Sequence, residues 1–118
     1  MSVSTKYDKY PKYLKVKVSG KWTRDNAVSV IEEIKVEADS QQTKRILLDL
    51  QDLSYPESEM VRFYSGEKIA EVFPYPFKIA AYLQPEKINR FAENVAVNRG
   101  ADMRSFDNLT DAVSWLLR

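Results

Sequence analysis

The sequence predicts a single α/β domain over residues 1–118, with a mixed, mainly parallel sheet of about four to five strands and about four helices. Strand-like and helix-like segments alternate along the chain, an order typical of right-handed crossovers between parallel strands. The run from Ile46 to Leu50 is almost continuously apolar, so we expect both faces of that strand to be covered by helices. A length of 118 residues suits one domain with its own core.

The first segment indicates a half-buried strand. Leu14, Val16 and Val18 alternate with lysines, which predicts one buried face and one solvated face, and we expect Gly20 to end the strand. A short partner strand is expected at residues 7–9, with a turn at residues 8–11.

The next segment indicates a helix capped by Thr23, followed by the central strand. Its apolar stripe recurs at helical spacing and predicts the buried face: Ala27, Val30, Ile31, Ile34 and Ala38.

A second helix is expected after the central strand. Ser54 and Glu57 have the spacing of a capping box and Pro56 suits a first turn, so we predict a helix from near Tyr55 to the Phe73-Pro74 pair. Gly66 is expected to let this helix approach the sheet closely. The predicted inward side chains are Met60, Phe63, Tyr64, Ala70 and Phe73.

The last third of the chain predicts two more strands and two more helices. A mostly apolar strand is expected at residues 77–83, and a helix restarting at Gln84-Pro85-Glu86 is expected to end with a left-handed Gly100. Arg104 places the strand at residues 102–106 near a sheet edge. The helix after it is capped by Asp107 or Asn108. The expected inward residues are Ile88, Phe91, Ala92 and Val95 in the first helix and Leu109, Ala112, Val113 and Leu116 in the second.

Composition excludes several chemistries. The chain has no cysteine, which excludes disulfides, thiol nucleophiles and cysteine-based metal sites, and no histidine, which removes the usual general base. We therefore expect a protein that is not an enzyme and holds no cofactor or metal. The enzymatic alternative rests on Asp49 and Asp52, which follow a central strand and could together hold Mg²⁺; Asp52 is more simply a turn residue.

The N-terminal segment bears on location and partners. It lacks the apolar core of a signal peptide, and no apolar run reaches membrane-spanning length, so we expect a cytoplasmic protein without a transmembrane segment. Lysines interleave with tyrosines at residues 6–13, a composition that nucleic-acid and anionic-lipid surfaces use. No nucleic-acid recognition motif accompanies them, so we interpret them as a solvated strand face and expect no specific nucleic-acid partner.

Four stretches resemble the SpoIIAA-like proteins of the STAS superfamily, and the likeness covers nearly the whole chain in element order. They are residues 45–50, 91–100, 104–106 and 111–116. The resemblance implies a bacterial protein with a mixed sheet and packed helices, related in shape to anti-sigma-factor antagonists and to lipid-binding CRAL-TRIO domains.

The resemblance also implies a regulatory site. STAS antagonists of the sporulation type carry an Asp-Ser pair at a helix start, and a partner kinase phosphorylates the serine. The pair falls here on Glu57-Ser58, with Glu59 and Met60 where small residues usually follow. Carboxylates beside Ser58 would repel a phosphate. One hypothesis is therefore an interaction module that contacts a protein partner through Ser58, Glu57 and Glu59, with Ser58 as its phosphosite.

The main hypothesis is a non-catalytic binding domain that holds a small apolar or lipid-like ligand. It rests on aromatic residues that cluster around the second helix, the loop after it and the following strand, since apolar pockets suit such ligands. The simpler interpretation is that these side chains fill the core. The expected pocket residues are Phe63, Tyr64, Phe73, Tyr75, Phe77 and Tyr82. A second copy of the chain, forming a homodimer, is a further expected partner.

Overall fold

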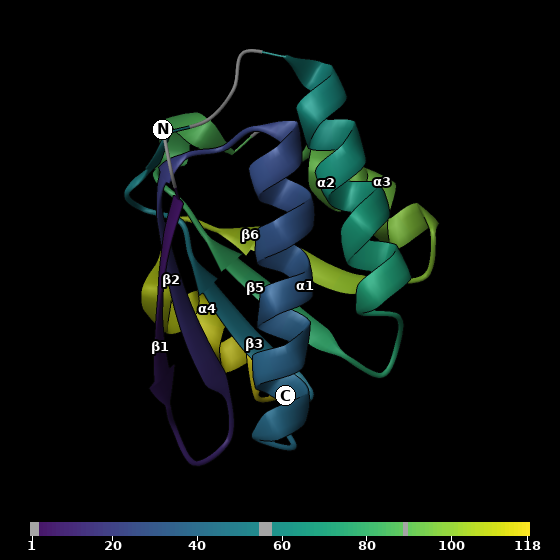
Figure 1. Cartoon of the computed structure of the whole chain (residues 1–118). Coiled ribbons are helices and arrows are strands. Elements are labelled where there is room, and N and C mark those ends of the chain that lie inside the picture. The colour runs from purple at the N-terminus through teal and green to yellow at the C-terminus, as the bar shows by residue number, and fades with distance from the viewer. Residues whose placement is uncertain (1–2, 55–57, 89) are drawn as a thin grey trace.

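The computed structural model describes residues 3–54, 58–88 and 90–118, and it shows one sheet covered by helices on both faces (Figure 1). The strands are β1 (Val3–Lys9), β2 (Leu14–Lys21), β3 (Arg45–Asp49), β4 (Leu53–Ser54), β5 (Lys78–Tyr82) and β6 (Asp102–Phe106). The helices are α1 (Arg24–Ser40), α2 (Glu59–Val72), α3 (Phe91–Asn98) and α4 (Leu109–Leu116), with a short 3-10 helix η1 (Pro85–Lys87). The predicted α/β class is confirmed.

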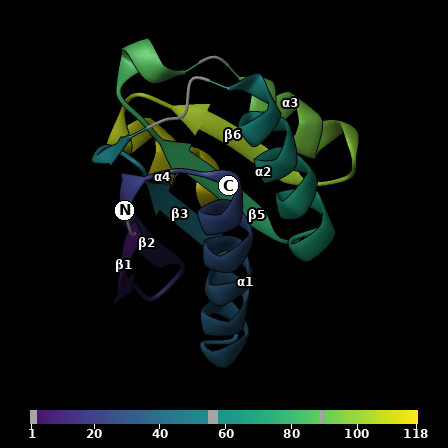
Figure 2. The same cartoon turned by 45° about the horizontal axis from the view of Figure 1, so that its top comes forward.

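The sheet has the order β1-β2-β3-β5-β6, and β4 pairs with the end of β2. β1 runs antiparallel to β2, while the β2–β3, β3–β5 and β5–β6 pairs are parallel. β1 and β6 are therefore the edge strands of this order, and for β6 this confirms the position predicted from the charged Arg104 in its middle. The helices α1, α2 and α3 lie on one face and α4 lies on the other, which Figures 1 and 2 show from two directions.

The central strand β3 supplies both cores, as its continuous apolar run predicted. Ile46 and Leu48 belong to the large core under α1, α2 and α3. Leu47 points the other way and joins Ala80, Ala112 and Leu116 in a small core against α4. Two covered faces explain why this strand does not alternate.

The first helix confirms its sequence pattern. The buried residues of α1 are the five of the predicted stripe, and the Thr23 hydroxyl accepts a hydrogen bond from the Asn26 N–H. Gly100 has a φ of 103°, as its predicted left-handed position requires. The Asn108 side chain caps α4 by accepting from the Asp111 N–H.

The start of α2 differs from its prediction. The helix begins at Glu59 with Ser58 as its N-cap, four residues after the expected start. Ser54 is instead part of β4, where its carbonyl accepts a hydrogen bond from the Trp22 N–H. Strand pairing therefore uses the residue that the capping box assigned to the helix. The other predicted cap residues, 55–57, lie outside the described residues.

The inward face of α2 also differs. Ala70 and Phe73 are buried as predicted, but the other buried residues of α2 are Ser65, Gly66 and Ile69, and Met60 is 55% exposed. α2 packs on α1 and α3 rather than flat on the sheet, which turns its first apolar residues toward solvent. A Cβ on Gly66 would clash with the Ala92 carbonyl oxygen, so this glycine permits close approach to α3, not to the sheet.

Four smaller expectations were also wrong. The helix expected from Gln84 is divided into η1 and α3, because Arg90 adopts a left-handed conformation with φ 57°. β1 is seven residues long, and its turn to β2 is closed by the Tyr10 N–H donating to the Tyr13 carbonyl. β2 continues past Gly20 to Lys21, since it pairs there with β4. Leu109 is 41% exposed, because it lies in the first turn of α4.

Candidate functional site

The predicted regulatory residues lie at the exposed N-terminal end of α2. The Ser58 backbone is extended, and its Oγ accepts a hydrogen bond from the Met60 N–H at 3.2 Å. Ser58, Glu59 and Met60 are all exposed, while Glu57 lies outside the described residues. The hydroxyl is accessible to a partner protein, and the helix dipole favours negative charge at this end.

The charge of Glu59 is balanced within the helix. One of its carboxylate oxygens lies 2.9 Å from an Arg62 guanidinium nitrogen. The pair spans one helical turn and is partly exposed, so its contribution to stability is modest. Its consequence for the site is electrostatic, because Arg62 offsets the carboxylate that adjoins Ser58.

The six predicted pocket aromatics do not form one pocket. Phe63 and Tyr64 pack edge to face near the outside of α2, where the guanidinium groups of Arg99 and Arg24 lie over their rings. Phe73 and Phe77 pack together inside the large core. Tyr75 is 74% exposed, and Tyr82 packs against the small core on the opposite face of the sheet.

The structure instead has a partly enclosed apolar cavity of about 90 Å³ between the sheet and the helices α1, α2 and α3. None of the six aromatics lines it. Its apolar walls include Val18, Leu48, Leu53, Ile69, Ala81 and Met103. Leu50 and Leu83, which directly follow β3 and β5, also line it, so the cavity extends to the carboxyl ends of the parallel strands. Ligands of open α/β sheets bind at this end.

Trp22 is an aromatic residue that lines this cavity and that the sequence pattern did not indicate. Its indole N–H donates to the Ser65 Oγ at 2.8 Å, and the Ser65 hydroxyl donates to the Val61 carbonyl at 2.7 Å. Both side chains line the cavity with their polar groups satisfied. The position of Trp22, just beyond β2, was the signal available in the sequence.

Charged residues also line the cavity. Arg62 comes from α2, Lys87 from η1, and Arg90 and Glu93 from the start of α3. The Lys87 Nζ donates to the Leu53 carbonyl at 3.1 Å. Glu93 accepts from the Ser105 N–H at 2.6 Å and pairs with Arg90 at 3.0 Å. Among the residues that the structure describes, Arg62, Lys87, Arg90 and Glu93 thus border an apolar interior.

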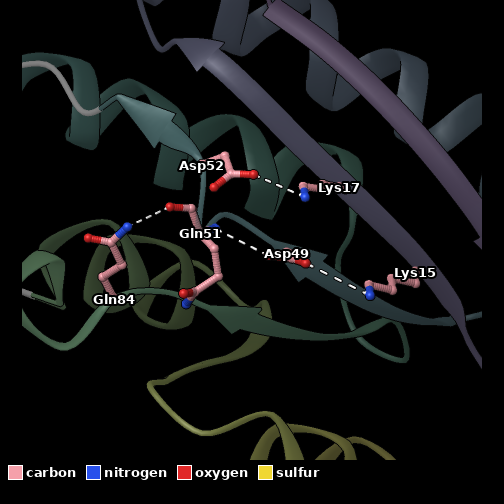
Figure 3. Close-up of polar contacts among 6 residues, drawn as sticks. All are labelled: Lys15, Lys17, Asp49, Gln51, Asp52 and Gln84. Atoms are coloured by element: carbon pink, nitrogen blue, oxygen red, sulfur yellow. Dashed lines mark hydrogen bonds and ion pairs between the residues drawn. The ribbon is translucent and has the colours of Figure 1, made fainter.

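The two aspartates of the enzymatic alternative are each held by a lysine (Figure 3). Lys15 Nζ lies 3.8 Å from Asp49, whose other carboxylate oxygen accepts from the Gln51 N–H. Lys17 Nζ lies 3.0 Å from Asp52, and this hydrogen bond raises the pKa of Lys17. The two carboxylates point to different lysines, and residues 3–54, 58–88 and 90–118 contain no cluster of three or more acidic side chains that could bind a metal. The magnesium hypothesis is therefore not supported.

Within the described part of the chain, no helix combines the length and apolar character needed to cross a bilayer.

The sequence matches no family model and no curated protein. Two solved structures are similar over 98% of this chain and 94% of their own. An anti-sigma factor antagonist from Mycobacterium paratuberculosis is 14% identical with a TM-score of 0.64. An uncharacterized protein with a SpoIIAA-like fold from Shewanella loihica is 19% identical with a TM-score of 0.58.

The chain has the SpoIIAA-like fold.

This match confirms the fold that the resemblance implied. At identities below 20%, the SpoIIAA-like fold fixes the arrangement of strands and helices but not the residues of a site. The cavity lies between the sheet and the helices α1, α2 and α3 and reaches the carboxyl ends of β3 and β5.

Proposed function

We propose that this chain is a non-catalytic regulatory module that binds a protein partner through the N-terminal end of α2. The observation that carries the proposal is the exposure of three consecutive residues at this helix end, Ser58, Glu59 and Met60. Met60 adds apolar area to this surface, and exposed methionines are typical of adaptable protein contacts. The similarity in fold to an anti-sigma factor antagonist supports the same class of function.

Phosphorylation of Ser58 would change this surface directly. A phosphate on an N-cap serine can accept from the helix N–H groups and interacts favourably with the dipole. Glu59 opposes it by like charge, and the pairing of Glu59 with Arg62 reduces that repulsion. We therefore propose Ser58 as the phosphosite of the module.

The test compares proteins that co-purify with the tagged chain from its own host. We expect a partner that is retained by the wild type and lost with Ser58→Asp and with Met60→Asp. Val36→Ala is the matched control, because Val36 is 70% exposed on α1, away from the α2 surface. Recovery of the same proteins with all four chains would contradict the proposal. The intact mass of the chain from its host shows whether a phosphate is present.

A second candidate function is the binding of a small apolar ligand. The apolar cavity beneath α2 favours it, in place of the six aromatics that the sequence suggested. Its position at the carboxyl ends of the strands is the usual location of ligand sites in such sheets.

A further inference from the structure

β1 leaves one side of its backbone unpaired. In the sheet order of the described residues, β1 pairs with β2 alone, and Figures 1 and 2 show it at the outer margin of the sheet. Edge strands that resist pairing with other chains are usually very short or interrupted by proline. β1 instead runs for seven residues without a proline, so it offers a full-length edge to another strand.

The hairpin between β1 and β2 determines which backbone groups face this open edge. The Tyr10 N–H donates to the Tyr13 carbonyl at 3.0 Å, which makes these residues a hydrogen-bonded pair of the ladder. Bonded and non-bonded pairs alternate along an antiparallel ladder, so the even-numbered residues of β1 direct their N–H and C=O groups toward β2. The residues whose groups point outward are therefore the odd-numbered ones: Val3, Thr5, Tyr7 and Lys9.

Lys6 and Asp8 carry charges without partners on the exposed face of β1. Neither forms an ion pair with any residue in the described ranges 3–54, 58–88 and 90–118, whereas the lysines of β2 on the same face are held by aspartates. Charged side chains on an edge strand usually prevent pairing. Two opposite charges at this spacing act differently, because an antiparallel strand of the same sequence can match them reciprocally.

Backbone and charge together leave one such register. Bonded pairs across a two-fold axis must join outward-pointing residues, so the axis passes through a residue of β1 and not between two. An axis at Lys6 opposes two lysines and an axis at Asp8 opposes two aspartates, both of which are unfavourable. An axis at Thr5 shortens the overlap to residues 3–7 and matches neither charge. An axis at Tyr7 places Lys6 opposite Asp8 twice.

We therefore propose that two copies of this chain form a closed dimer through antiparallel pairing of β1 with β1, with Tyr7 on the two-fold axis. The same register brings Lys9 opposite Thr5 of the second copy, whose hydroxyl donates to Glu33. Glu33 forms no ion pair within the described part of the chain, so Lys9 supplies its cation from across the interface. Pairing uses the open edge of both copies and therefore stops at two. The dimer is independent of partner binding at α2, since residues 58–60 take no part in it.

The interface is small, so the dimer should be in exchange with the single chain. Three bonded pairs supply about six backbone hydrogen bonds, two for each pair. Interfaces at the low end of the size range are weak, and we expect half of the chains to be paired at roughly 10–100 µM. In more dilute protein the chain is a monomer, in which β1 pairs with β2 alone.

Sedimentation velocity and native mass spectrometry measure the dimer directly. We expect a species of twice the 13.7 kDa of one chain to increase as the concentration is raised to about 1 mM. Thr5→Pro removes one outward N–H per copy and should abolish the dimer in a folded chain, because proline is tolerated on the open side of an edge strand. Thr5→Ala is the matched control, since it removes the same hydroxyl and keeps the N–H. A wild type that is monomeric at the highest concentration, or a folded Thr5→Pro that dimerises like Thr5→Ala, overturns the proposal.

Disulfide formation measures the register, because the chain has no cysteine of its own. Mixing Lys6→Cys with Asp8→Cys brings two thiols into one directly opposed pair and leaves the second Lys6–Asp8 pair intact. We expect this mixture to form a disulfide-linked dimer at least about tenfold faster than either variant alone, since thiols on diagonal residues lie beyond disulfide reach. Faster cross-linking of Lys6→Cys by itself would place the axis at Lys6 and overturn the proposed register.

Charge reversal tests the two ion pairs. Lys6→Glu and Asp8→Lys should each weaken the homodimer by about tenfold, because each variant opposes like charges in two places. An equimolar mixture of the two variants should dimerise to within about threefold of the wild type, as a heterodimer in which both pairs are restored. Lys21→Glu, exposed on β2, changes the net charge equally and is the control for Lys6→Glu. A mixture that pairs no better than its separate variants would overturn the role of these charges.

Discussion

Tyr7 shows how the fold changes the chemistry of one side chain. It lies half-buried on β1 and donates a hydrogen bond to Glu33 Oε1 at 3.1 Å, and Thr5 donates to the same oxygen at 2.9 Å. Burial, with a smaller contribution from the Glu33 carboxylate, raises the pKa of Tyr7 from 10.0 to about 12. The phenol therefore stays protonated in the folded chain over a range where it ionises in the unfolded chain.

This shift predicts a loss of stability in alkali. The folded chain binds the Tyr7 proton more tightly than the unfolded chain, so the stabilisation is complete below pH 10 and is lost as pH rises through about 12. Urea unfolding of the wild type and of Tyr7→Phe over this range measures it, and the difference isolates Tyr7 from the lysines. We expect the free energy of unfolding to fall more steeply in the wild type. Parallel curves would contradict the assignment.

The individual residues of the candidate site were the features least predictable from the sequence. The role of Ser58 as the N-cap of α2 was missed, because the capping-box spacing pointed to Ser54 instead. The cavity was also missed, since Trp22, Ile69 and Met103 are far apart in sequence and meet only through the packing of α2 on its neighbours. The apolar residues that follow β3 and β5 were the one available signal.

At the scale of elements, Gly66 determines how α2 packs on α3. A Cβ at this position would clash with the Ala92 carbonyl oxygen and lie 2.9 Å from the Val95 Cβ. Because the first neighbour is backbone, it cannot move aside without shifting α3.

We therefore expect Gly66→Ala to destabilise the protein by about 1–3 kcal/mol, as overpacking usually does. The effect should appear although alanine is favoured over glycine in helices by about 1 kcal/mol. Chemical denaturation measures it, with Glu67→Ala on the exposed side of α2 as the control, whose change should stay within about 0.5 kcal/mol. A more stable Gly66→Ala variant would show that α2 and α3 are not in this close contact.

The elements also differ in how far they could be predicted. α1 followed its pattern because its stripe and its cap are both local signals. The division between η1 and α3 depends on a left-handed arginine at position 90, which no local pattern indicates. The start of α2 was misplaced because Ser54 pairs with β2 through contacts that are distant in sequence.

At the scale of the whole molecule, the sheet should unfold unevenly. β3 and β5 pair on both sides and have helices over both faces, whereas β1 pairs with β2 alone. We expect backbone amides of β3 and β5 to exchange with solvent hydrogen at least about tenfold more slowly than those of β1. Hydrogen-exchange mass spectrometry or NMR measures this, and equal protection of β1 would mean that the hairpin unfolds only with the entire domain.

The overall topology was the most predictable level, because alternation of strands and helices leaves few ways to connect a parallel sheet. The antiparallel strand β1 was the exception: residues 7–9 were predicted, but the strand is seven residues long. Its side chains carry little apolar character, so its length depends on pairing with β2.

The lysine–aspartate pairs beside β2 have a consequence for folding fidelity. Lys15 and Lys17 point to the same face and reach Asp49 and Asp52, while Val16 and Val18 point into the large core. A slip of β2 by one residue along β3 would move the lysines under α1 and present valines to the two carboxylates. A one-residue slip therefore loses both ion pairs and buries charge, which disfavours this misaligned β2–β3 pairing before the helices have packed.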